Sequence, residues 1–216
     1  MAVATGDGLT ARRTQNNANP AGKIRSRKIP GESGIWIFLL GDMLVFAEMF
    51  FIFVLLRAQN RELFATSQNL VNPFFGLIYT LLLLASSWAV VMAVSTARKG
   101  SIDLSSRLLW WGFAGGAAFA AIKIVEYATK LTAGITPATN QFFMMYFVMT
   151  LVHLLHACVG LAALVYVRTQ VTALGFAEPD SVDRLERLRM IEVGAVFWHM
   201  VDLLWIVLFA LFYLRG

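Results

Sequence analysis

The stretch that decides the fold is PFFGLIYTLLLLASSWAVVMAVSTA, residues 73–97, which contains no charged side chain. As an α-helix it would be about 37 Å long at 1.5 Å per residue, enough to cross a hydrocarbon layer of about 30 Å. It begins at Pro73 directly after Asn72, an N-cap residue followed by proline at the first helical position. The stretch therefore predicts a transmembrane helix with a defined start.

Four further apolar runs predict, with this one, an all-α membrane protein built as a bundle of five transmembrane helices. Hydrophobic residues make up 58% of the 216 residues and charged residues only 14%, against roughly 25% in soluble domains. The expected spans, within a membrane domain of residues 30–216, are approximately 33–56, 74–97, 105–128, 138–167 and 190–214. Thr136-Pro137 is the expected start of the fourth span, and residues 180–192 predict an amphipathic extension before the fifth.

Residues 1–29 are polar and rich in Lys and Arg, which predicts a disordered cytoplasmic tail. With five spans, the tail, the loop after the second span and the loop before the fifth lie on one side, and these segments hold most of the basic residues. The positive-inside rule then places the N-terminus in the cytoplasm and the C-terminus across the membrane. The net charge of +5 is explained by topology and does not indicate nucleic-acid binding.

Apart from Arg107 and Glu192 at the starts of their spans, eight acidic, basic or histidine side chains lie within the expected spans, although such a group at the bilayer centre costs about 2.5–3.5 kcal/mol on insertion scales. They are Asp42, Glu48, Lys123, Glu126, His153, His156, His199 and Asp202. Depth along the helices predicts one intramembrane polar cluster on the first, fourth and fifth spans, formed by Asp42, His153, His156, His199 and Asp202. Lys123 and Glu126, three residues apart on one helix face, predict a separate pair nearer the outer surface. The role of Glu48 stays open.

Three interpretations of the cluster are open: a polar lock between helices, a proton relay, or a haem or metal site. The lone Cys158 cannot form an internal disulfide or a thiolate metal site. Because the chain also lacks a Gly-rich phosphate loop, His-Glu-x-x-His and a Ser/His/Asp arrangement, we expect no catalytic residue and no metal site of its own. Gly112 and Gly116 form a GxxxG pattern that permits close helix packing. The six tryptophans are interpreted as interface anchors and lipid-facing bulk.

Four segments resemble subunit III of the haem-copper respiratory oxidases. Residues 197–205, FWHMVDLLW, resemble the family's aromatic-Trp-His-Phe-Val-Asp-x-x-Trp signature. Residues 147–161 resemble Thr-Gly-x-His-Gly-x-His-Val-x-x-Gly, with Thr150, His153, His156 and Gly160 in place. Glu126-Tyr127 resembles the end of a Gln-x-x-Glu-Tyr pattern, and residues 34–46 resemble the first common helix with its intramembrane carboxylate. The resemblance covers residues 29–216.

The departures from the family pattern are local. Gly41-Asp42 stands where the family has Ser-Glu, and Lys123 replaces the Gln. Leu151 and Leu154 replace the two glycines of the His motif. The two additional N-terminal helices of the mitochondrial type, whose cleft holds phospholipid, are absent. Five helices and the Gly-Asp variant resemble the branch associated with quinol oxidases and nitric oxide reductases.

The resemblance implies an accessory subunit without redox centres in a bacterial inner membrane, bound to catalytic subunit I of a terminal oxidase or nitric oxide reductase. Haem and copper would be held by that partner, and phospholipid is a candidate ligand. Such a subunit supports assembly and durable turnover, and is linked to proton and oxygen access. By position, Asp42 takes the place of the family's intramembrane Glu, and His199 that of its imidazole neighbour. The alternative is a stand-alone proton-coupled transporter or membrane haem protein. The electron donor, the acceptor and the exact partner stay open.

Overall fold

The computed structural model describes residues 33–178 and 181–214, and this part of the chain forms six helices. They are α1 (Ser33–Gln59), α2 (Arg61–Gln68), α3 (Pro73–Arg98), α4 (Ile102–Thr132), α5 (Gln141–Leu174) and α6 (Val182–Tyr213). All but α2 contain a segment long and apolar enough to cross a membrane. The prediction of an all-α protein with five spans is thereby confirmed. The expected tail, residues 1–29, lies outside the described residues.

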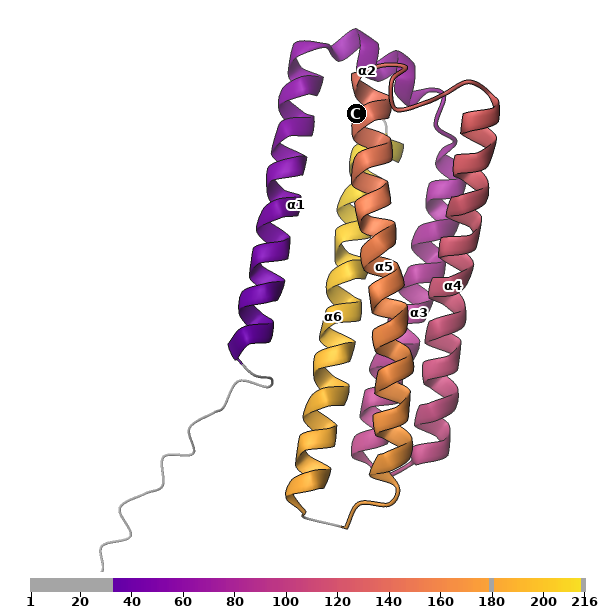
Figure 1. Ribbon diagram of the computed structural model, residues 1–216. Helices are drawn as coiled ribbons and strands as arrows, with labels where there is room; N and C mark the ends of the chain where they lie inside the picture. The colour runs from indigo at the N-terminus through magenta and orange to yellow at the C-terminus, as the bar shows by residue number, and fades with distance from the viewer. Residues whose placement is uncertain (1–32, 179–180, 215–216) are drawn as a thin grey trace, which may run out of the picture.

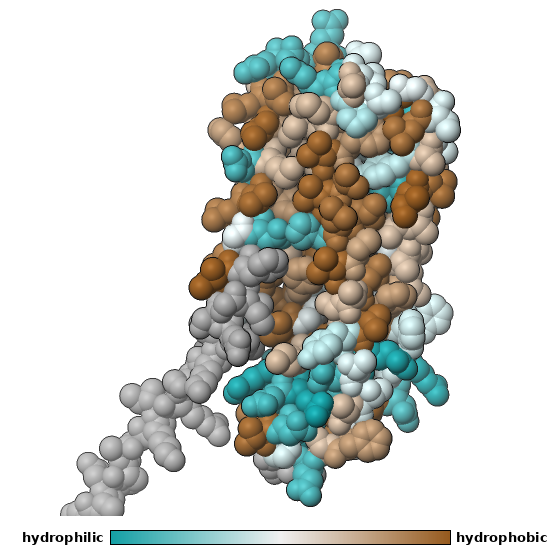
Figure 2. Space-filling view, in the orientation of Figure 1, coloured by the Kyte–Doolittle hydropathy of each residue, from teal (hydrophilic) through white to brown (hydrophobic). Residues whose placement is uncertain are grey.

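Helices α3, α4, α5 and α6 pack side by side as a four-helix bundle, whereas α1 stands to one side of it (Figure 1). The short α2 crosses one end of the molecule, which we call the α2 end. We call the opposite end, with the α3–α4 and α5–α6 connections, the basic end because Arg98, Lys99, Arg107 and Arg184 lie there. Between the two hydrophilic ends the surface is mainly apolar (Figure 2).

The helix starts show one correct and one wrong prediction. Asn72 caps α3 as expected, its side chain accepting a hydrogen bond of 2.9 Å from the backbone N–H of Phe74. The start expected at Thr136-Pro137 is wrong: Asn140 caps α5 instead, accepting 2.9 Å from the N–H of Phe143. Thr136 belongs to a turn in which its N–H donates to the hydroxyl of Thr139 at 2.9 Å. Both sites carry N-cap residues, and the one adjoining the unbroken apolar run starts the helix.

Each spanning helix extends past its predicted span at one end or both, because helical turns continue beyond the apolar run. The fifth span shows this most clearly, since α6 begins at Val182, directly after Ser181, whose hydroxyl accepts from the N–H of Arg184 at 3.2 Å. Of the expected amphipathic face, Ile191 is buried while Val182 and Leu185 are exposed. The extension is therefore a continuous part of α6 that joins the core only near its end.

Helix α2 is an amphipathic helix of 8 residues, Arg61–Gln68, that is not predicted from the sequence. Phe64 is buried under it, and the Gln68 side chain donates to the backbone carbonyls of Phe212 at 3.3 Å and Leu214 at 2.7 Å. These carbonyls lie at the end of α6, where a helix has no internal donors for them. The short helix thus closes the α2 end of the bundle by satisfying the terminus of α6.

Two tryptophans form the centre of the bundle, which corrects their interpretation as interface anchors. Trp198 and Trp205 of α6 are buried to 1% and 0% exposure. The indole N–H of Trp198 donates to the Ser86 hydroxyl at 3.1 Å, and that of Trp205 to the Thr80 hydroxyl at 3.2 Å. Because α3 supplies an acceptor for each N–H, both rings can be buried without loss of hydrogen bonds.

Small residues make room for these rings. Gly116 of the GxxxG pattern lies against Trp198 and Leu161, and Gly112 lies against Val90 of α3. The pattern therefore serves packing inside the chain. On α5, a Cβ atom added to Gly160 would lie 2.7 Å from Cε3 of Trp198, closer than packed atoms approach. The glycine is needed for space at this contact.

We predict that Gly160→Val lowers the free energy of unfolding by about 1–3 kcal/mol, because a rigid buried indole cannot move away from the added methyl groups. The measurement is denaturant unfolding of the purified protein in detergent. Ala162→Val, on the exposed face of the same helix, is the matched control and should change stability little. Equal effects of the two substitutions would contradict the packing explanation.

Candidate functional site

Six polar side chains from four helices meet inside the bundle toward the α2 end. We call this group the Lys123 network; its members are Tyr79, Lys123, Glu126, Lys130, Tyr146 and Tyr213. The ammonium of Lys123 donates to Glu126 Oε2 at 2.9 Å, to the Tyr146 hydroxyl at 2.8 Å and to the Tyr213 hydroxyl at 3.0 Å. Lys123 is fully buried, at 0% exposure.

The Glu126 carboxylate has partners on both oxygens. Tyr79 donates to Oε2 at 2.8 Å and Tyr146 donates to Oε1 at 2.8 Å. The ammonium of Lys130 lies 3.6 Å from Oε1. A charge buried in a bilayer is tolerated when it is paired and hydrogen-bonded. Because the tyrosines come from α3, α5 and α6, the pair on α4 connects all four bundle helices.

A second polar contact joins α1 to α5. His156 Nε2 lies 2.9 Å from Asp42 Oδ1, and its other ring nitrogen lies 2.7 Å from the backbone oxygen of Val152. The imidazole ring also packs edge-on against Phe46, with 5.3 Å between ring centroids. Since a ring nitrogen facing a carbonyl oxygen must carry the hydrogen, the Val152 contact orients the ring toward Asp42.

A third polar contact joins α3 to α6. Nδ1 of His199 lies 2.6 Å from the Ser87 hydroxyl, and the buried carboxyl of Asp202 follows three residues later on α6. Oδ1 of Asp202 has no hydrogen-bond partner among the described residues. This contact ties the two helices together near the middle of the bundle.

His153 lies in the core with 0% exposure, and neither ring nitrogen has a hydrogen-bond partner among the described residues. Its neighbours are aromatic: ring centroids lie 5.7 Å away for Phe119 and 5.4 Å away for Trp205. The first histidine of the motif is therefore surrounded by rings, whereas the second, His156, holds a carboxylate. The two have different environments although they share one helix.

The structure divides the expected polar cluster. Asp42 meets His156 and His199 meets Ser87, and no described side-chain hydrogen bond joins these two contacts or includes Asp202. The expected pairing of Asp42 with His199 is wrong, because α1 presents its carboxylate to α5. The expected Lys123 and Glu126 pair is present.

The hydroxyl groups that contact the charged and histidine side chains are not predicted from the sequence. Tyr79, Tyr146, Tyr213 and Ser87 come from helices other than those of the charged groups they contact. The available signal was general: an intramembrane charge requires donors and acceptors on a facing helix. Which tyrosine or serine meets it depends on rotation and register of the helices, which spacing within one helix does not reveal.

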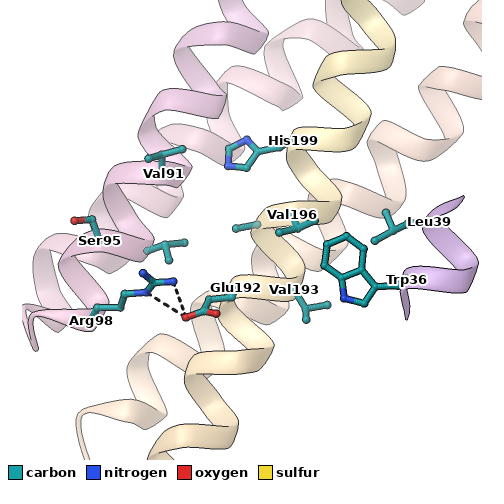
Figure 3. Close-up of a pocket in the computed structure, with 11 residues that line it drawn as sticks. Trp36, Leu39, Val91, Ser95, Arg98, Glu192, Val193, Val196 and His199 are labelled. Atoms are coloured by element: carbon teal, nitrogen blue, oxygen red, sulfur yellow. Dashed lines mark hydrogen bonds and ion pairs between the residues drawn. The ribbon is translucent and has the colours of Figure 1, made fainter. Parts of the chain in front are cut away.

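A cavity of about 670 Å³ opens between α1, α3 and α6 toward the basic end. Trp36 and Leu39 of α1 line one side, and Val91 and Val196 lie opposite on α3 and α6 (Figure 3). At its outer edge Arg98 donates to Glu192 Oε1 at 2.8 Å and 3.1 Å, while His199 lies at the inner end. The cavity is thus apolar along its walls and charged at its mouth.

Among the described residues no group of three or more His, Cys, Asp or Glu side chains is placed to hold a metal ion. The two polar pairs and the Lys123 network each join helices instead. Their geometry is that of interhelical hydrogen bonds, which stabilise membrane proteins by about 0.6–2 kcal/mol each.

The family model for cytochrome c oxidase subunit III matches residues 25–216. The chain belongs to the cytochrome c oxidase subunit III family. It is similar to cytochrome bo(3) ubiquinol oxidase subunit 3 of Buchnera aphidicola subsp. Schizaphis graminum, at 29% identity over 85% of this chain and 93% of the relative. Quinol oxidase subunit 3 of Bacillus spizizenii is 30% identical over 85% of this chain and 86% of that protein. Cytochrome c oxidase subunit 3 of Thermostichus vulcanus is 28% identical, covering 84% and 85%.

Membership of the family indicates the kind of protein in which these polar contacts occur. Members of the subunit III family are accessory subunits of haem-copper oxidases and are generally without redox cofactors. The five apolar helices and the bacterial relatives make this a multi-pass protein of a bacterial inner membrane. The resemblance seen in four sequence segments is confirmed.

Removing one partner of the Lys123–Glu126 pair should have unequal effects. We predict that Glu126→Leu lowers the free energy of unfolding by about 3–5 kcal/mol, because two lysines lose their only buried counter-charge in the network. Lys123→Met should cost less, since Lys130 and the tyrosines still face the carboxylate. Unfolding of the purified protein in detergent measures both.

The control for this pair is Glu192→Gln, which breaks the ion pair with Arg98 at the basic end, where the Arg98 side chain is 59% exposed. An exposed pair contributes about 0–1 kcal/mol, so this variant should stay close to the unsubstituted protein. A Lys123→Met variant less stable than Glu126→Leu would contradict the proposed distribution of partners.

Proposed function

We propose that this chain binds the catalytic subunit of a bacterial haem-copper oxidase, supports its assembly and keeps it active through many turnovers. Haem and copper are held by that partner, which carries out the electron transfer and the reduction of oxygen. The observation that carries the proposal is the use of the intramembrane polar groups: Lys123, Glu126, His199 and Asp42 each face a side chain on another helix. These groups hold helices together, which is what a supporting subunit requires.

The basic end faces the cytoplasm in this proposal. Arg98, Lys99, Arg107 and Arg184 lie at that end, and positively charged loops stay on the cytoplasmic side. The N-terminus is then cytoplasmic and the C-terminus lies on the opposite side. The Lys123 network falls in the outer half of the membrane, and the Asp42–His156 contact lies closer to the cytoplasm.

The Asp42–His156 contact is the group best suited to a role beyond packing. Imidazole serves as a proton shuttle in many proteins, and the side chains of His156 and Asp42 are both partly exposed, at 22% and 12%. This partial exposure supports a contribution to proton access of the partner subunit. Lys123 is fully enclosed by its partners and supports a structural role instead.

Phospholipid is the ligand we propose for the cavity between α1, α3 and α6. Its apolar walls, with Val91, Val196 and Leu39, suit an acyl chain. Arg98 at the mouth suits a phosphate. The ion pair of Arg98 with Glu192 would loosen when a headgroup takes over the guanidinium.

Oxygen is the electron acceptor of the complex that we propose. The relatives described above are named as quinol and cytochrome c oxidase subunits. Gly41-Asp42 resembles the branch associated with nitric oxide reductases, so nitric oxide is the alternative electron acceptor to be tested.

Affinity purification of the tagged chain from native membranes, followed by mass spectrometry, tests the proposal. We expect a haem-containing catalytic subunit to co-purify, and the activity of that complex on oxygen or nitric oxide to identify the acceptor. A Soret band in the isolated chain would favour a membrane haem protein instead. Purification without any oxidase subunit, together with solute transport in liposomes, would favour a transporter.

Asp42→Asn should leave membrane insertion intact, because the amide has nearly the same shape and can still hydrogen-bond to His156. We predict weaker retention of the catalytic subunit or faster loss of activity during prolonged turnover, since the charge facing the imidazole is gone. Activity over time in the purified complex measures this. Unchanged co-purification and unchanged durability would exclude a role for the carboxylate.

A further inference from the structure

Glu48 is the only Asp, Glu, Lys, Arg or His side chain that is exposed in the middle of a spanning helix, among the residues that the structure describes. It lies about 22 Å along α1 from Ser33, at 1.5 Å per residue. It makes no hydrogen bond or ion pair with any described residue. Of the other intramembrane acids, Asp42 and Glu126 meet side chains on other helices, and Asp202 is buried inside the bundle. Glu48 is therefore a carboxylate that no side chain of residues 33–178 and 181–214 satisfies.

Helix α1 has two seams of residues on opposite faces, each with alternating spacings of three and four residues, as in packed helices. The inner seam packs on the rest of the chain and consists of Leu39, Asp42, Phe46, Met49, Phe53 and Leu56. The outer seam is exposed and consists of Ile37, Gly41, Leu44, Glu48, Phe51 and Leu55. Each seam carries one carboxylate. That of the inner seam meets an imidazole, and that of the outer seam faces away from the chain.

The outer seam combines features of a helix-packing surface. Leu44 is 71% exposed and Phe51 63%, so Glu48 lies between large apolar side chains. Among the described residues, nothing outside the adjoining backbone of α1 lies within 4 Å of where a Cβ would stand on Gly41, which leaves room for another helix to approach closely. Hydrophilic surface interrupts the apolar band on the side where α1 lies (Figure 2). Lipid tails would cover the apolar residues but offer no hydrogen-bond donor to a carboxylate.

We propose that the outer seam of α1 is a docking surface for a transmembrane helix of the oxidase catalytic subunit, which presents a basic or hydrogen-bond-donating side chain to Glu48. The identity of the partner rests on the proposed function. The inner seam supports the chemistry, since its carboxylate, Asp42, is met by His156 of α5. A parallel pairing of two copies of this chain through the same seam would bring two Glu48 carboxylates together, which like charges oppose.

Site-specific photo-crosslinking in native membranes tests the docking surface. A photoreactive amino acid is placed at Leu44 or Phe51 of the outer seam, and at Trp111 of α4 or Leu155 of α5 as matched exposed controls. We expect crosslinks to the catalytic subunit from Leu44 and Phe51 and none from the controls. Crosslinks from the controls alone, to a second copy of this chain, or to lipid alone would overturn the proposal while the complex itself still forms.

Substitution of Glu48 tests the charge. Because the side chain is exposed, Glu48→Leu should leave the folding of this chain unaffected and reduce retention of the catalytic subunit about three- to thirtyfold, the range expected for an interhelical hydrogen bond. Glu48→Gln, which keeps polar atoms and loses the charge, should lie between. Trp111→Leu is the control and should retain the partner fully. Full retention by Glu48→Leu would overturn the proposal.

The same purification separates the two proposals. If the unsubstituted chain retains no oxidase subunit, the proposed function fails, and the docking surface fails with it. If the complex forms but neither Glu48 nor its neighbours affect it, only the docking surface fails.

Discussion

The buried Lys123–Glu126 ion pair is the constraint on which the bundle depends. Two charges inside an apolar layer are stable only if each has further partners, and these come from three other helices. Tyr79, Tyr146 and Tyr213 can reach the pair in one relative rotation and register of α3, α5 and α6. A slide of one helix by a single residue would leave a charge unpaired, so the network selects one arrangement among many that are equally apolar.

The tryptophans of α6 act in the same way at neutral contacts. Trp198 and Trp205 fill the centre of the bundle, and each indole N–H has a hydroxyl acceptor on α3. Gly116 and Gly160 are small where these rings need space. Polar pairing sets the register and small residues set the distance. The apolar surface on the outside faces lipid and does little to fix the rotation or register of the helices.

Helix α1 packs differently from the four bundle helices, because only one of its faces contacts the rest of the described chain. It packs beside the bundle through one seam, where Asp42 meets His156 and Phe53 lies 4.9 Å from Phe212 between ring centroids. Its opposite face carries Glu48, which has no partner within the described part of the chain. A helix with polar groups on two opposite faces is suited to pack between its own bundle and a neighbouring subunit. This explains why α1 is less enclosed than the other spans and why the cavity lies beside it.

The sequence by itself determined the class, the five spans, the start of α3 and the Lys123–Glu126 pair. All of these follow from local properties: apolar length, capping residues, and i, i+3 spacing on one helix. Only the tertiary structure decided that Asp42 meets His156, that three tyrosines enclose Lys123, and that Glu48 faces outward. These depend on the rotation of one helix against another, and rotation is set by many side-chain contacts at once.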